Sequence, residues 1–123
     1  MPRIIIVEGD HSFRKMLWLT LVKMGYEVVE AVNGSEAMKL HRCLPADVLM
    51  TDLIMPDQGG LKTIQEFHRR HPQVKIIAIS SEARTSAQDS LRTARMLGAT
   101  RIFTKPFSVH EIACALKKMM PAY

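Results

Sequence analysis

Short runs of hydrophobic residues alternate along the chain with segments in which hydrophobic residues recur at helical spacing. The first run, at residues 3–7, is β-branched and has no polar alternation, which is typical of a strand covered on both faces. Similar runs predict strands at residues 3–7, 26–32, 48–52, 74–79 and 101–104. The helical spacing predicts helices at residues 12–24, 35–44, 61–70, 86–97 and 108–119.

Local signals mark the ends of these helices. Ser12 is placed to cap the first helix and Gly25 to end it, while Ser108 and Glu111 form a capping box before the last helix. The hydrophobic stripe of the first helix contains Phe13, Met16, Leu17, Thr20, Leu21 and Met24. The residues outside that stripe, which either pack half-buried or form a docking surface, are Trp18, Leu19 and Val22. The inward face of the last helix is expected to contain Ile112, Ala115, Leu116 and Met119.

The order of these elements predicts the fold class. Strict alternation of strands and helices requires a parallel sheet with right-handed crossovers and helices on both of its faces. A chain of 123 residues is long enough for one such core. The sequence therefore predicts an α/β protein in which residues 1–123 form a single domain, a three-layer α/β/α sandwich around a five-stranded parallel sheet.

Composition and charge narrow the classes of protein further. No apolar run approaches the roughly 20 residues that span a bilayer, and the start lacks a signal-peptide layout, so we expect a cytoplasmic protein. Lys and Arg number 17 against 12 Asp and Glu, but they are spread along the chain, which favours solvated faces over direct nucleic-acid binding. Cys43 and Cys114 are expected to be reduced and mostly structural, and His41, His68, His71 and His110 have no ligand-like pairing.

Polar side chains stand at the ends of four predicted strands. In an open α/β sheet, ligands bind beyond the carboxyl ends of the strands, so these side chains are expected to converge. The residues predicted at that edge are Glu8, Gly9, Asp10, Asp52, Ser80 and Lys105.

Asp52 is the residue of greatest chemical interest in this set. It ends a buried strand and is followed by Met55-Pro56, which forces an extended exit, so its carboxylate is either held for chemistry or merely caps a turn. A carboxylate can accept a phosphoryl group if the negative charge is compensated. Mg²⁺ bound by oxygen ligands, a lysine ammonium and a serine hydroxyl are groups that provide such compensation.

The sequence resembles the response regulator receiver domain of two-component signalling over essentially its whole length. The motifs that carry the resemblance are Ile4–Glu8, Arg14, Leu17, Gly25–Val28, Asn33-Gly34, Glu36-Ala37, Pro45–Asp47, Asp52, Met55-Pro56, Gly60-Leu61, Gly98-Ala99 and Lys105–Phe107. The resemblance implies a flavodoxin-like sheet of strand order 2-1-3-4-5, with Asp52 as phosphoacceptor, Ser80 and Lys105 as its partners, and a cis Lys105–Pro106 bond. It also implies Mg²⁺ held by Glu8, Asp52 and the carbonyl of Ile54.

Two departures from the family pattern affect the expected chemistry. The family usually carries adjacent acids after the first strand, but here Gly9 follows Glu8, so we expect a weakened Mg²⁺ site. Asp10 is one position late and is expected either to reach the metal or, the reading we favour, to face solvent. On the last strand, Ile102 stands where the family places a rotating Tyr or Phe, and the adjacent Phe103 points to the other face.

These observations leave three hypotheses. The first is a phosphorylatable receiver, a signalling switch rather than an enzyme, which takes its phosphoryl group from a sensor histidine kinase or phosphotransfer protein. The second is a degenerate receiver that acts as a phosphorylation-independent interaction module, a reading motivated by Gly9 and Ile102. The third, a flavin- or nucleotide-binding enzyme of the same fold, ranks last because the acidic segment 8–11 would repel phosphate.

The resemblance also implies the kinds of partner. We expect a downstream effector protein or a covalently linked output domain as the partner. Residues Pro121–Tyr123 are either a natural end or the start of a linker to such a domain. Strand 101–104 and the last two helices are the expected output face and the candidate surface for a homodimer. The cognate kinase, the output pathway and the oligomeric state are not encoded in any pattern that we recognise.

Overall fold

Strands and helices alternate through the part of the chain that the structure, a computed structural model, describes: residues 2–53, 59–81 and 87–120. The strands are β1 (Arg3–Val7), β2 (Glu27–Ala31), β3 (Val48–Asp52), β4 (Lys75–Ser81) and β5 (Arg101–Lys105). The helices are α1 (His11–Lys23), α2 (Gly34–Cys43), α3 (Gly60–Arg70), α4 (Ala87–Leu97) and α5 (Val109–Met119).

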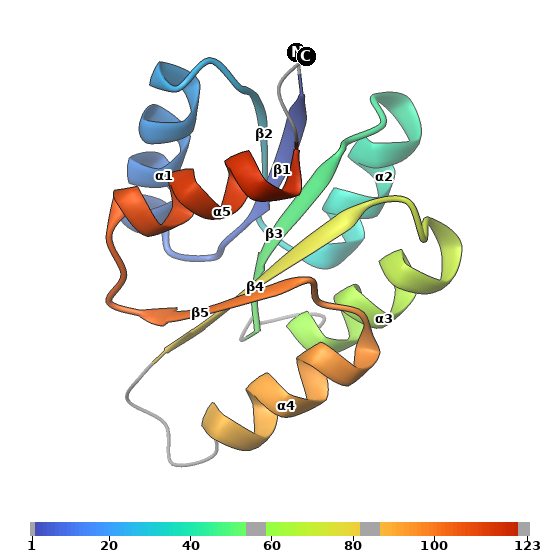
Figure 1. Ribbon diagram of the computed structural model, residues 1–123. Coiled ribbons are helices and arrows are strands. Elements are labelled where there is room, and N and C mark those ends of the chain that lie inside the picture. Colours follow the sequence, from blue (N-terminus) through green and yellow to red (C-terminus); the bar gives the residue numbers. More distant parts are fainter. Residues whose placement is uncertain (1, 54–58, 82–86, 121–123) are drawn as a thin grey trace.

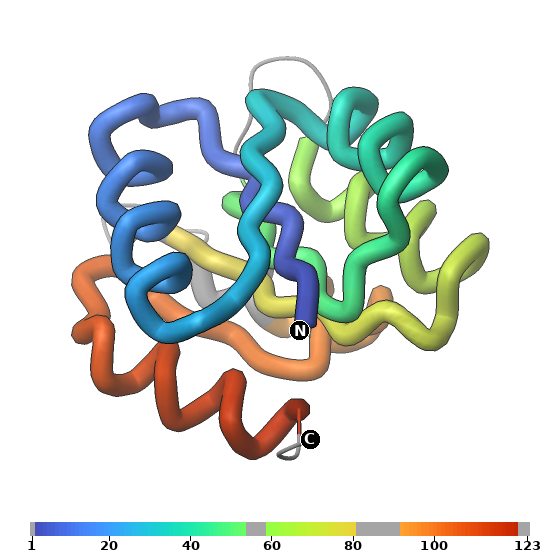
Figure 2. The backbone as a smooth tube through the Cα atoms, turned by 90° about the horizontal axis from the view of Figure 1, so that it is seen from above, coloured from blue at the N-terminus to red at the C-terminus, as the bar shows by residue number. Residues whose placement is uncertain are grey.

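The strands form one parallel sheet of order β2-β1-β3-β4-β5. Helices α1 and α5 cover one face, and α2, α3 and α4 cover the other (Figures 1 and 2). This arrangement confirms the predicted α/β/α fold and the 2-1-3-4-5 strand order.

Alternate residues of each inner strand supply two separate hydrophobic cores. Along β1, Ile4 and Ile6 pack with α1 and α5, whereas Ile5 and Val7 pack with α2 and α3. All four side chains are almost completely buried. Two covered faces therefore explain why the strand has no polar alternation.

The first helix begins earlier than the sequence predicts. Asp10, and not Ser12, is its N-cap, because the Asp10 carboxylate accepts the backbone N–H of Phe13 at 3.2 Å. Asn33 likewise caps α2, which starts at Gly34 rather than at residue 35. Gly25 has φ +96° and Ser108 accepts the N–H of Glu111, which confirms both of these predicted helix ends.

The predicted buried faces of α1 and α5 agree with the structure to different extents. The stripe of α5 is confirmed, since all four predicted residues are buried. In α1 only Leu17 and Leu21 are buried, and Met16 is 39% exposed because the helix contacts the sheet along a narrower line than the stripe suggests. Trp18 packs half-buried against the same core, while Leu19 is exposed.

Two further findings concern the surface. None of the helices in the described residues has the length and the apolar character needed to cross a bilayer. Cys43 and Cys114 are both exposed free thiols, so the prediction that they are structural is wrong; each lies on the solvent side of its helix.

Gly60 is required where α3 starts against the end of β3. A Cβ at this position would overlap the carbonyl oxygen of Asp52 and the Cα of Leu53, whereas a Cβ on the neighbouring Gly59 would meet nothing within 4 Å. We expect Gly60→Ala to lower the free energy of unfolding by about 1–3 kcal/mol through overpacking. Gly59→Ala is the matched control and should be neutral or slightly stabilising. Equal effects of the two variants in urea denaturation would contradict this account.

His41 is a buried titratable group between α2 and α3. It is 3% exposed, its Nδ1 accepts the backbone N–H of Ala46 at 3.0 Å, and its ring centroid lies 4.2 Å from that of His71 and 5.5 Å from that of Phe67. The two imidazole rings are thus in contact with each other, although neither belongs to a group of three possible metal ligands within the described residues. Burial, and then the charge of His71, lowers the pKa of His41 below its usual 6.5.

This lowered pKa makes stability depend on pH. As the pH falls below 6.5 towards the folded pKa, the unfolded chain gains a proton at residue 41 that the folded protein does not, so stability decreases. We expect His41→Asn, whose side-chain oxygen can still accept the Ala46 N–H, to flatten the dependence of unfolding free energy on pH between 7 and 5. The change in slope should not exceed about 1.4 kcal/mol per pH unit, the limit for one proton. A wild-type slope in His41→Asn would overturn this reading.

Candidate functional site

Three charged side chains converge at the carboxyl edge of the sheet. Glu8 follows β1, Asp52 ends β3 and Lys105 ends β5. Asp52 lies two residues after Met50, and Lys105 lies two residues after Phe103. Met50 and Phe103 both pack in the α1–α5 core. Because side chains alternate along a strand, Asp52 and Lys105 emerge on that same face of the sheet. Glu8 and Asp52 are only 3% and 7% exposed.

Lys105 joins the two acids. Its Nζ lies 3.0 Å from Glu8 Oε1 and 3.5 Å from Asp52 Oδ2, and it also stands 4.0 Å from the centroid of the Phe13 ring. Burial by itself lowers the pKa of Lys105, but the hydrogen bond and charge of Glu8, with those of Asp52, outweigh it and raise the pKa. The ammonium is thus held charged between two carboxylates and an aromatic face.

Glu8 is fixed by its backbone as well as by its side chain. Its Oε2 accepts the N–H of Asp10 at 3.0 Å, and its carbonyl accepts Arg14 Nη1 at 2.7 Å. Burial raises the pKa of Glu8, and the hydrogen bonds from Asp10 and Lys105 oppose this rise without cancelling it. Arg14 also pairs with Glu30 at 3.3 Å, which ties this corner of the site to β2.

The backbone around Asp52 is held by its neighbours in the sheet. Leu53 donates its N–H to the carbonyl of Ile79 at 2.9 Å, and Thr51 Oγ1 donates to the Asp52 carbonyl at 2.9 Å. The following helix α3 is capped by Gly59 without a side-chain hydrogen bond, so Asp52 is not its N-cap. One oxygen of the Asp52 carboxylate faces Lys105 Nζ.

The remaining predicted residues occupy different places. Ser80 is 2% exposed on β4, next to Ile79, the residue that pairs with Asp52, so it lies at the same edge of the sheet. The ion pairs of Lys105 join Glu8 and Asp52. Ile54 lies outside the described residues.

Asp10 is exposed and its carboxylate caps α1, the solvent-facing reading that the sequence favours. Within the described residues no group of three His, Cys, Asp or Glu side chains is arranged to hold a metal ion. The donor set still fits Mg²⁺, which often binds proteins through one or two carboxylates and keeps several waters.

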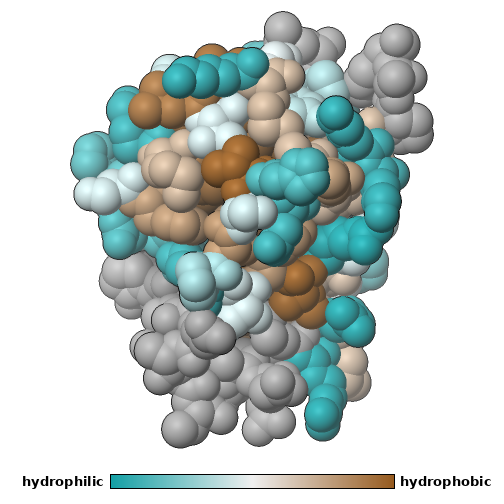
Figure 3. Space-filling view, turned by 60° about the vertical axis from the view of Figure 1, so that its left-hand side comes forward, coloured by the Kyte–Doolittle hydropathy of each residue, from teal (hydrophilic) through white to brown (hydrophobic). Residues whose placement is uncertain are grey.

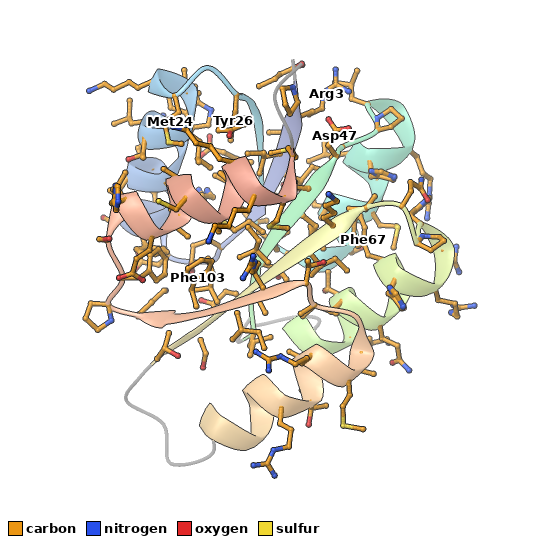
Figure 4. All side chains as sticks on the ribbon, viewed as in Figure 1. Arg3, Met24, Tyr26, Asp47, Phe67 and Phe103 are labelled. Atoms are coloured by element: carbon orange, nitrogen blue, oxygen red, sulfur yellow. The ribbon has the colours of Figure 1, made fainter. Side chains whose placement is uncertain are left out.

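The aromatic side chains near Lys105 lie on one face of the sheet. Phe103 packs in the α1–α5 core (Figure 4), whereas Ile102 packs against the α2–α3–α4 core, as the alternation along the strand predicts. The ring centroids of Phe103 and Phe107 are 5.7 Å apart, and those of Phe107 and Phe13 are also 5.7 Å apart. The Lys105–Pro106 bond is cis, as the resemblance implies.

Sequence reasoning missed the roles of Phe13 and Arg14 in this site. Phe13 was assigned only to a hydrophobic stripe, and Arg14 only to a motif. Their contacts with Lys105 and Glu8 depend on how α1 lies over the end of β1, and no spacing along the chain encodes that.

The chain is similar to known proteins over nearly its whole length. The chain is 34% identical over 118 residues to the chemotaxis protein CheY of Thermotoga maritima, covering 95% of this chain and 96% of that protein. It is 30% identical to the response regulator receiver protein CpdR of Brucella abortus over 99% of both chains. The structure of the chemotaxis protein CheY4 of Vibrio cholerae, 24% identical, has the same fold with a TM-score of 0.86, covering 98% of this chain and 99% of that one.

The sequence pattern of one family spans nearly the whole chain. Residues 4–117 match the family described as the response regulator receiver domain. This match includes Glu8, Asp52, Ser80 and Lys105. The chain therefore belongs to the response regulator receiver domain family.

Proposed function

We propose that the chain accepts a phosphoryl group on Asp52 from a sensor histidine kinase or a phosphotransfer protein. The single observation that carries the proposal is the contact of one ammonium, Lys105 Nζ, with both Asp52 and Glu8. Receiver domains take part in phosphorylation-based two-component signalling and generally are not enzymes. We assign Lys105 and Ser80 as the partners of Asp52 in this reaction.

The transfer requires charge compensation at Asp52. A carboxylate oxygen attacks phosphorus, the P–N bond to the donor imidazole breaks, a P–O bond to Asp52 forms, and the leaving imidazole nitrogen takes a proton. The product carries more negative charge than the carboxylate. Lys105 Nζ already lies at Asp52 Oδ2, so it can move to a phosphoryl oxygen without first being desolvated. We assign the buried hydroxyl of Ser80, at the end of the neighbouring strand β4, as a further hydrogen-bond donor to the phosphoryl group.

Glu8 and Asp52 would hold Mg²⁺, the ion that the family generally binds. When bound, Mg²⁺ supplies positive charge to phosphoryl oxygens. Gly9 offers no side-chain oxygen, and the carboxylate of Asp10 caps α1. We therefore propose that Mg²⁺ affinity is lower than in receivers with two adjacent acids after β1.

The second candidate function is a phosphorylation-independent interaction module. It is motivated by Gly9 and Ile102, but relatives named for chemotaxis and response regulation do not favour it. Receivers interact with histidine kinases and with effector or output domains, and we propose β5 and α5 as part of the surface that this chain presents to them.

Incubation with a small phosphodonor and Mg²⁺, followed by intact-mass measurement, tests the phosphoacceptor. We expect one phosphoryl adduct on the wild-type chain and none on Asp52→Asn. Asp47→Asn is the matched control: Asp47 precedes β3 at the opposite end of the sheet, beside Arg3 (Figure 4), and should leave the adduct unchanged. Absence of an adduct on the wild type, or its persistence in Asp52→Asn, would disprove the proposal.

A metal titration tests the role of residue 9. Gly9→Asp adds a carboxylate beside Glu8 and should raise Mg²⁺ affinity about tenfold or more, the scale on which ligands to a metal usually act. Asp10→Asn should leave the affinity unchanged, since asparagine caps a helix as well as aspartate does. An unchanged affinity in Gly9→Asp would overturn this interpretation of residue 9, and a loss in Asp10→Asn would show that Asp10 already serves as a ligand.

A further inference from the structure

Two metal-ligating side chains lie one turn apart on α5, away from the phosphorylation site. Cys114 Sγ is 3.6 Å from His110 Nε2. Both residues are exposed, and they border a hollow of 340 Å³ between α5 and the edge strand β5, which Arg101 and Phe103 also line. The contact between His110 and Cys114 was not anticipated from the sequence.

The separation of these two atoms matches one edge of a tetrahedral zinc site. Zn–S and Zn–N bonds of about 2.3 and 2.0–2.1 Å at a tetrahedral angle place sulfur and nitrogen about 3.6 Å apart. A weak S–H···N hydrogen bond has a similar length, so the pair is already held at the spacing that zinc needs. Thiolate and imidazole are also ligands that suit Zn²⁺ better than Mg²⁺.

We propose that His110 and Cys114 of two copies of this chain together bind one Zn²⁺ and link the copies through α5. Structural zinc is almost always four-coordinate. Among the residues that the structure describes, no three His, Cys, Asp or Glu side chains of one chain are arranged to hold a metal ion. In our proposal one chain therefore supplies two of the four ligands of the tetrahedral site. A second copy, related by a two-fold axis, supplies the same two ligands. Two-fold symmetry is the commonest symmetry of protein dimers.

Charge explains why the association needs the metal. Lys117 and Lys118 follow the pair on α5, and Arg101 lines the hollow, so two copies approaching here bring like charges together. Figure 3, which brings the side of α1 and α5 forward, shows hydrophobic side chains interspersed with hydrophilic ones. On zinc binding, each S–H bond breaks, its proton passes to the buffer and an S–Zn bond forms. The two thiolates then balance the charge of the ion.

Sedimentation at several zinc concentrations tests the proposal, with a phosphine reductant present to prevent disulfides. We expect a monomer in chelator and a dimer that binds one Zn²⁺ per two chains. Both His110→Ala and Cys114→Ser should remain monomeric at that zinc concentration. Cobalt in place of zinc should give the charge-transfer absorption of a Co–thiolate bond, which Cys114→Ser should lose.

Controls separate this site from the rest of the molecule. Cys43→Ser, which removes the exposed thiol on α2, and Asp52→Asn, which removes the proposed phosphoacceptor, should both dimerise with zinc as the wild type does. Mg²⁺ alone should leave the chain monomeric. A monomer at saturating zinc, one Zn²⁺ bound per single chain, or a zinc-dependent dimer that survives His110→Ala and Cys114→Ser would overturn the proposal.

Discussion

The buried contact of Lys105 with Glu8 and Asp52 is the constraint on which the functional edge of the sheet depends. Two carboxylates that are each under a tenth exposed cannot both be ionised at low cost without a nearby cation. The ammonium reaches both only because β1, β3 and β5 end at the same level of the sheet. The parallel topology, the register of β3 against β4 and the close start of α3 at Gly60 all serve to keep these three strand ends together.

The period of two along each strand divides this molecule into two functional sides. Lys105 shares its side with Phe103, and the rings of Phe107 and Phe13 continue from there to α1. Ile102 stands on the other side, against the α2–α3–α4 core. A change in the contacts of Lys105 therefore acts first on the aromatic side chains of the α1–α5 side.

The β5–α5 unit carries chemistry at two places. Its Lys105 end belongs to the charged site, whereas the His110–Cys114 pair lies on the outer surface of the helix that follows. Hard carboxylate oxygens at the first place and a thiol with an imidazole at the second select different metal ions.

The sequence by itself determined much of this protein. Unbroken apolar runs with polar ends encode strands that are covered on both faces, and their alternation with helices encodes the parallel sheet. Because the carboxyl ends of such strands share one edge, the sequence is sufficient to place Glu8, Asp52, Ser80 and Lys105 at that edge. Capping side chains and glycines gave most helix ends to within one or two residues.

Only the tertiary structure decided which of these groups touch. Three contacts illustrate this: Asp10 caps α1, Lys105 lies over the ring of Phe13, and His41 is buried beside His71. Such contacts depend on how the elements pack against one another. Hydrophobic periodicity specifies which face of a helix is buried, but not its exact rotation or translation on the sheet, and so Met16 was wrongly expected to be buried. Side-chain contacts across elements are fixed by packing, which exists only once the whole chain has folded.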